Sequence, residues 1–146
     1  MADYKNLVAG LGGAIALNLL HESLKNRDKD MPRVDLLGEE ALNKGLSWIG
    51  KRIESPNTLY KATLAGDVLG NTLYYSLIGA KGTKGLMLKG LISGLSAGVG
   101  AVLLPGPMGL NDRPVTRTPK TKILTIAYYL TGAVVTAAIL KTLSKK

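Results

Sequence analysis

The stretch ILTIAYYLTGAVVTAAIL, residues 123–140, contains no charged side chain and directly follows the basic residue Lys122. A helix built from it is apolar or small on every face, whereas the helix of a water-soluble protein keeps one polar face. With its semi-polar neighbours the stretch reaches the roughly 20 residues that a helix needs to cross a bilayer. It therefore predicts a membrane-spanning helix over about 121–141.

Three other stretches are nearly free of charge and are separated by strongly charged segments. They are residues 7–20, 62–80 and 90–104, and flanking residues extend them to predicted spans over about 4–24, 58–80 and 85–104. A soluble four-helix bundle with unusually apolar helices is the alternative. We predict an all-α polytopic membrane protein with four transmembrane helices, forming a single transmembrane helical domain over residues 1–146.

The segment between the first two predicted spans is too charged to cross a membrane, but it is amphipathic. Over residues 36–53, LLGEEALNKGLSWIGKRI, leucine and isoleucine recur at helical spacing while charged residues fill the other side. Asp35 stands where an N-cap is expected. The pattern predicts an interfacial amphipathic helix between the first and second spans. A soluble connector helix is the alternative.

The distribution of basic residues predicts the topology. Most of the 19 Lys and Arg residues lie in or beside loops one and three, residues 25–57 and 105–120. Because basic loops stay on the cytoplasmic side, we expect an integral protein of a bacterial inner membrane with these loops in the cytoplasm. The formal net charge of +9 suits anionic membrane lipids. No nucleic-acid recognition motif accompanies that charge, so we expect no nucleic acid as a partner.

Glycines recur at a spacing of four residues in two of the predicted spans. Gly90, Gly94 and Gly98 form a GxxxGxxxG pattern, a glycine zipper, and Gly66 and Gly70 repeat the spacing in the second span. Small residues let helix backbones approach closely in lipid, where no hydrophobic force draws helices together. We expect close helix contacts at these glycines and a homo-oligomer. Packing within a single chain is the alternative.

Polar residues in the second span form the centre of a candidate site. Asp67, Asn71 and Tyr74 follow an i, i+4, i+7 spacing, which places them on one helical face. A carboxylate inside a span usually faces a bundle interior or a wet cavity, because burial in lipid is costly. The pattern favours a proton or ion site, and the alternative is a polar clasp that fixes helix register.

Polar residues at the end of the first span lie in the same half of the bundle, and loop three opens on that side. Arg113 in this loop is an expected partner for a carboxylate. Placement of His21 and Glu22 in the headgroup region, as residues at a helix end, is the alternative. The predicted ligand- or ion-binding set is Asn18, His21, Glu22, Asp67, Asn71, Tyr74 and Arg113.

The residue inventory limits the chemistry. The chain has no Cys and a single His, and no paired-histidine metal motif, so we expect neither a metal nor a cofactor and assign no catalytic residue. An acid in a glycine-rich span favours an ion- or proton-coupled transporter or channel-like protein. The alternatives are an accessory or structural membrane subunit and a membrane enzyme acting on a lipid-like substrate. The expected ligand is a small ion or an amphiphilic small molecule.

Overall fold

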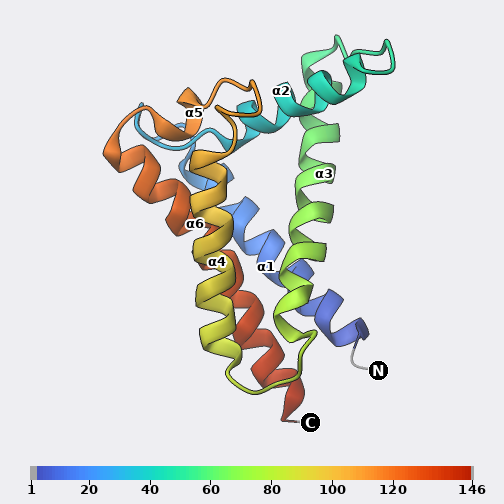
Figure 1. The fold of residues 1–146 in the computed structure, drawn as a ribbon, viewed down its shortest axis with the longest axis vertical. Helices are drawn as coiled ribbons and strands as arrows, with labels where there is room; N and C mark the ends of the chain where they lie inside the picture. The colour runs from blue at the N-terminus through green and yellow to red at the C-terminus, as the bar shows by residue number, and fades with distance from the viewer. Residues whose placement is uncertain (1–2, 146) are drawn as a thin grey trace.

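The computed structural model describes residues 3–145, which are all-helical and contain no strand, so the predicted all-α class is confirmed. The four long helices lie side by side, and α1 begins at the end of the molecule where α6 ends (Figure 1). The elements are α1 (Asp3–Leu24), α2 (Val34–Ser47), α3 (Pro56–Ser76), η1 (Leu77–Gly79, one 3₁₀ turn), α4 (Leu86–Leu103), α5 (Arg113–Thr116) and α6 (Pro119–Ser144).

Three helices are long and apolar enough to cross a bilayer. They are α1 over Tyr4–Leu24, α4 over Leu86–Leu103 and α6 over Pro119–Ser144, and they indicate an integral membrane protein. The fourth predicted span corresponds to α3, which has the length but a more polar composition, since Asp67 and Asn71 lie within it. Three of the four predicted spans are thus supported.

Two of the long helices begin at a hydroxyl cap followed by proline. Ser55 Oγ and Thr118 Oγ1 each accept a hydrogen bond from the backbone N–H three residues on, at 3.4 and 3.1 Å. Pro56 and Pro119 follow in the first turn, where the missing proline N–H costs no helical hydrogen bond. These caps start α3 and α6 slightly earlier than the predicted spans at 58 and 121.

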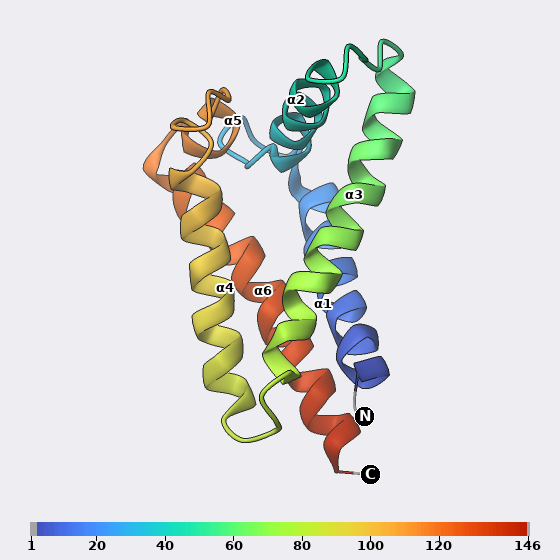
Figure 2. The same ribbon diagram turned by 45° about the vertical axis from the view of Figure 1, so that its right-hand side comes forward.

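The helix α2 lies across the end of the bundle where α1 ends and α3 begins (Figures 1 and 2). The predicted N-cap is wrong, because Arg33 occupies the cap position and Asp35 lies inside the first turn with only 6% of its surface exposed. The helix ends at Ser47, short of the predicted residue 53, and Gly50 then turns the chain with φ 71°. The helix is therefore shorter than its amphipathic pattern, and it turns a carboxylate inward.

The α4–α6 contact runs through the glycines of α4. A Cβ at Gly94 would stand 2.7 Å from Leu130 Cα, and one at Gly98 would stand 2.6 Å from Ile126 Cα. Any side chain at these positions would collide with the α6 backbone. The GxxxGxxxG pattern of α4 therefore lies against another helix of the same chain.

The glycines of α3 face the other way. Within residues 3–145, no atom comes within 4 Å of a Cβ built on Gly66 or Gly70. Since α3 turns its Asp67 face inward, the neighbouring glycines point outward. The close helix contact that we expected at Gly66 and Gly70 is not made by residues 3–145.

Three helices cross in the middle of the bundle. A Cβ at Gly132 of α6 would stand 2.9 Å from the carbonyl oxygen of Gly13 in α1, and 2.6 Å from the Tyr75 hydroxyl of α3. That hydroxyl donates a 2.8 Å hydrogen bond to the backbone carbonyl of Tyr129. From this crossing towards the chain ends the interior is an apolar cluster of Ala9, Tyr75, Ile78, Leu86, Ala133, Ala137 and Leu140.

Candidate functional site

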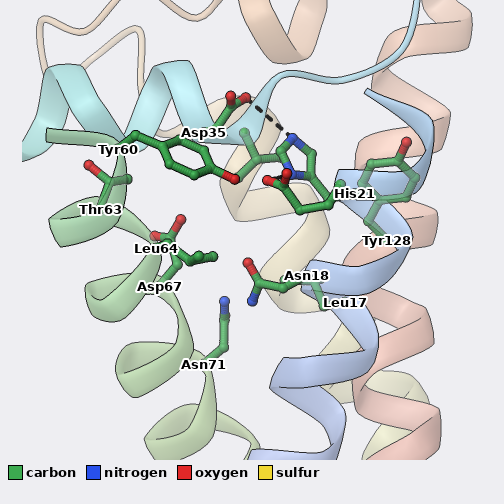
Figure 3. Close-up of a pocket in the computed structure, with 12 residues that line it drawn as sticks. Leu17, Asn18, His21, Asp35, Tyr60, Thr63, Leu64, Asp67, Asn71 and Tyr128 are labelled. Atoms are coloured by element: carbon green, nitrogen blue, oxygen red, sulfur yellow. Dashed lines mark ion pairs between the residues drawn. The ribbon is translucent and has the colours of Figure 1, made fainter. Parts of the chain in front are cut away.

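A polar pocket lies at the opposite end, between α1 and α3 and covered by α2 (Figure 3). Its cavity volume is about 20 Å³, which is room for about one water molecule. The lining residues come from these three helices and from α6. They are Leu17, Asn18, His21, Glu22, Val34, Asp35, Tyr60, Thr63, Leu64, Asp67, Asn71 and Tyr128.

Five of the predicted site residues line this pocket. Asn18, His21 and Glu22 reach it from α1, and Asp67 and Asn71 reach it from α3. In Figure 3 the two asparagine side chains point towards each other across the gap between the helices, with the Asp67 carboxylate above them. The structure therefore brings together polar groups that are far apart in the sequence.

Tyr74 and Arg113 do not line the pocket. Tyr74 lies about 10 Å further along α3 than Asp67, where α3 approaches α4, and its hydroxyl donates to the Ser93 carbonyl at 2.8 Å. Arg113 is exposed at the start of α5 and forms no ion pair within residues 3–145. The expected ion pair with Arg113 is absent there because α2, rather than loop three, covers the pocket.

Asp35 is the most strongly bound carboxylate at this end of the bundle. Arg33 donates to it from Nε at 2.9 Å and from Nη2 at 2.7 Å. His21 Nε2 lies 3.3 Å from Oδ1, and Lys25 Nζ lies 3.7 Å from Oδ2. Burial alone would raise the pKa of Asp35, but the His21 and Arg33 contacts outweigh it and hold that pKa far below its ordinary value. Asp35 is therefore ionised at neutral pH.

His21 connects this ion cluster to the pocket. Its ring packs edge-on against Tyr128, with centroids 6.2 Å apart. Nε2 is within ion-pair distance of Asp35 but is not aligned for a hydrogen bond, so this buried atom has no hydrogen-bond partner within residues 3–145. Nδ1 lies 3.5 Å from Glu22 Oε1. A buried ring nitrogen of this kind usually binds ordered water.

Lys25 closes the outer side of the cluster. Its ammonium lies 2.9 Å from Glu22 Oε2 and 4.7 Å from the centre of the Tyr60 ring, in cation–π geometry. Burial would lower the pKa of Lys25, but the Glu22 hydrogen bond and the charge of Asp35 raise it above its ordinary value. Lys25 therefore stays charged and neutralises Glu22 at the edge of the pocket.

Asp67 has a different environment from Asp35. Neither Asp67 nor Asn71 makes a side-chain hydrogen bond or an ion pair within the part of the chain that the structure describes. Asn18 donates to the Ala14 carbonyl at 2.9 Å, which leaves its amide oxygen free to face the pocket. The buried Thr63 hydroxyl also has no hydrogen-bond partner in residues 3–145. Carboxylate, amide and hydroxyl oxygens thus surround a volume of one water molecule.

Gly38 allows α2 to cover this volume. A Cβ at Gly38 would stand 2.7 Å from Thr63 Cγ2 and 3.5 Å from both carboxylate oxygens of Asp67. The α2 backbone therefore packs directly on α3 beside Asp67. A larger residue at Gly38 would push the two helices apart and open the pocket.

Most residues of the pocket and of the adjoining ion cluster that were not predicted from the sequence carry recognisable signals. Tyr60 and Thr63 precede Asp67 by seven and four residues, so they continue the Asp67–Asn71 face towards the start of α3. Lys25 follows His21 by one helical turn. The sequence does not identify Asp35 as a pocket residue, because an Asp directly before an amphipathic helix is expected to be its N-cap.

No family model, no curated protein and no solved structure matches this chain. The function is therefore argued from the geometry of the pocket. That geometry offers two acids: Asp35, which is buried and paired with cations, and Asp67, which is half-buried and lies among Asn18, Asn71 and Thr63.

Proposed function

We propose that this chain is an ion- or proton-coupled transporter or channel-like membrane protein in which Asp67 binds the proton or a small cation. The observation that carries the proposal is the setting of Asp67. Its carboxylate faces a small pocket lined by both polar and apolar side chains and has no ion-pair partner within residues 3–145, while its neighbours Asn18 and Asn71 supply amide groups. Intramembrane acids in such settings bind and release ions or protons.

The proposal includes α3 as the fourth span. Between Lys61 and Lys81 the sole charged residue is Asp67, which faces inward. The outward face carries Leu69 and Leu73, with 62% and 53% of their surfaces exposed, and suits contact with lipid. The 21 residues of α3 extend over about 31 Å, close to the thickness of the hydrocarbon core.

The helix α2 then lies at the membrane interface. Trp48 and Ile49 beyond its end are 81% and 69% exposed, and Lys51 and Arg52 follow directly. Tryptophan beside basic residues is typical of the headgroup region. By the positive-inside rule, this end faces the cytoplasm, and both chain ends lie on the other side of a bacterial inner membrane.

The size of the pocket favours a proton or a single small cation as the ligand. A cavity of about 20 Å³ holds one water molecule, and pockets for drug-sized ligands have volumes of about 300 Å³ or more. An acyl chain does not fit. The pocket therefore does not favour an enzyme that acts on a lipid-like substrate.

The test is flux through vesicles that contain the purified chain. Proton and Na⁺ uptake are measured under an imposed potential for wild type, Asp67→Asn and Asp28→Asn. Asn keeps the size of the side chain but cannot ionise. Asp28 is exposed and pairs with Lys120 outside the pocket, so its variant is the matched control.

We expect flux in wild type and in Asp28→Asn, and background flux in Asp67→Asn. The driving ion identifies the ligand, because proton uptake responds to the pH gradient and Na⁺ uptake responds to the Na⁺ gradient. Flux in Asp67→Asn at the wild-type rate contradicts the role of Asp67. Wild-type vesicles that move neither ion contradict transport altogether.

A second candidate function, an accessory or structural subunit, is favoured by the outer face of α3. Gly66 and Gly70 leave a stripe open to a neighbour, which a partner helix or a second copy would fill. Native mass spectrometry of Gly66→Leu/Gly70→Leu tests this, with Ser96→Leu on the exposed face of α4 as the control. An assembly lost in the double variant alone supports the second candidate, and a monomeric wild type opposes homo-oligomer formation.

A further inference from the structure

A second cavity lies at the same end of the bundle as the polar pocket but on the side of α5 and α6. Its volume is about 190 Å³, and its walls are the loop between α1 and α2, the α5 region and the first turn of α6. Lys25, Lys29, Arg33 and Arg117 line it together with a single acid, Asp28. The cavity is therefore strongly cationic.

Two of these basic groups are not neutralised. Asp28 is bound to Lys120 at 2.8 Å, so the one acid of the wall is already paired. Lys29 makes no ion pair within residues 3–145. Arg117 donates from Nη1 to the Lys29 carbonyl at 3.0 Å, which fixes the guanidinium and leaves its other N–H groups unused.

Arg33 adds a third set of donors. Its Nε and Nη2 are held by Asp35, which leaves Nη1 free and orients the guanidinium. A guanidinium fixed in this way presents a rigid set of donors, the arrangement that recognises phosphate oxygens. Three cationic groups thus line one small volume.

The walls of the cavity are held together before any ligand binds. The backbone N–H of Arg33 donates to the Pro114 carbonyl at 3.0 Å, and Thr121 Oγ1 donates to the Asp30 carbonyl at 2.8 Å. With the Arg117–Lys29 bond, these contacts join the first loop to α5 and α6. A preformed site loses less free energy in ordering when it binds.

The cavity also lies at the depth of lipid headgroups. The candidate spans of α1 and α6 end at Leu24 and begin at Pro119, next to the cavity walls. Basic pockets at the ends of membrane helices bind the phosphate groups of anionic lipids. The volume of about 190 Å³ accommodates a phosphate-sized group rather than a whole drug-sized molecule.

We propose that this cavity binds a phosphate group through Lys29, Arg33 and Arg117, either in the headgroup of an anionic lipid or as free inorganic phosphate. The site is separate from the Asp67 pocket and does not depend on transport.

The test compares two double variants of the full chain that remove equal charge. Lys29→Gln/Arg117→Gln removes two cations of the wall. Arg27→Gln/Lys122→Gln removes two exposed cations nearby that do not line the cavity. Binding of phosphatidylglycerol and of phosphatidylcholine is measured by native mass spectrometry. In a second arm, the melting temperature is measured in phosphate and in chloride at equal ionic strength.

We expect wild type and the control variant to bind phosphatidylglycerol about tenfold more tightly than phosphatidylcholine, and the cavity variant to lose this preference. If phosphate alone stabilises wild type and the control, without any lipid preference, the proposal holds with free phosphate as the ligand. Equal losses in the two double variants, or no response of wild type in either arm, overturn it. If the cavity double variant does not fold, the single variant Lys29→Gln is measured instead, because Lys29 is exposed and its substitution should not disturb folding. Binding of this variant at the wild-type level overturns the proposal.

Discussion

The α4–α6 and α1–α3 helix pairs of this bundle are held together in different ways. Along α4, glycines at three successive turns keep the backbone against α6 over the length of the contact. Between α1 and α3, Gly10 packs on the backbone at Thr72, and towards α2 the interior is filled by polar side chains and a cavity. A continuous stripe of small residues keeps α4 and α6 in close contact along their length. Between α1 and α3 the helices approach closely at Gly10, and at the other end the space between them is filled by polar and charged side chains.

The largest expected effect comes from removing the anion that closes the polar end. Asp35→Ala leaves the Arg33 guanidinium without its carboxylate and removes one of the two acids beside Lys25 and the His21 ring, so we expect a loss of about 3–5 kcal/mol in the free energy of unfolding. Asp28→Ala, which breaks an exposed pair, is expected to resemble wild type. Equilibrium unfolding in mixed micelles measures both. Equal stabilities of the two variants would show that the polar end is not held by charge.

The next effect distinguishes charge from size at Asp67. Asp67→Lys should cost about 2.5–3.5 kcal/mol, the insertion cost of a charged residue at a helix centre, because the longer side chain carries a cation into the middle of the span. Asp67→Asn should be tolerated, since it keeps the shape of the side chain. Melting temperatures in detergent compare the two. An unchanged melting temperature for Asp67→Lys would show that residue 67 is exposed to bulk water and that the pocket is not an interior site.

A smaller loss of stability is expected from a substitution in the α4–α6 contact. Gly94→Leu forces a side chain into Leu130 and should cost about 1–3 kcal/mol. Gly70→Leu adds the same side chain at a glycine with open space around it, and should leave the free energy of unfolding of the single chain unchanged. The same unfolding measurement applies. A comparable loss in Gly70→Leu would mean that the outer face of α3 is covered.

The smallest effect concerns pH. The folded-state pKa of Asp35 lies well below its ordinary value of 3.8, so the stabilisation is fully present above about pH 4. Below that pH the unfolded carboxyl binds protons first, and the contribution declines as the pH falls through the folded pKa. The stability difference between wild type and Asp35→Asn should stay constant from pH 5 to 7 and shrink below pH 4. A stability difference that grows as the pH falls would contradict a lowered pKa for Asp35 in the folded state.

Much of the fold was predictable from the distribution of charge. The windows without charge mark α1, α4 and α6, and the i, i+4 spacing of Asp67 and Asn71 marks the inward face of α3. The spacing of glycines identifies a small-residue face but not its neighbour. For this reason Gly94 meets α6 while Gly66, with the same pattern, meets open space.

The part of the site that could not be predicted depends on contacts between distant segments. Asp35 turns inward because His21 of α1 and two residues of the following loop, Lys25 and Arg33, converge on it. No local pattern distinguishes this arrangement from a helix cap. Arg113 failed as a predicted partner for the same reason, since its loop position left open which segment would cover the pocket.

The crossing of α1, α3 and α6 at Gly13, Tyr75 and Gly132 separates an apolar half of the bundle from a polar half. On the side of the chain ends, the helices pack around the apolar cluster. On the other side, α1 extends about 12 Å from Gly13 to His21, eight residues away. A change of about 5° in the crossing angle would shift His21 by about 1 Å, a large fraction of the width of a cavity that holds one water molecule. The width of the Asp67 pocket thus depends on the angle at which α1 crosses α3 and α6, and that angle is set by contacts between glycines and a tyrosine.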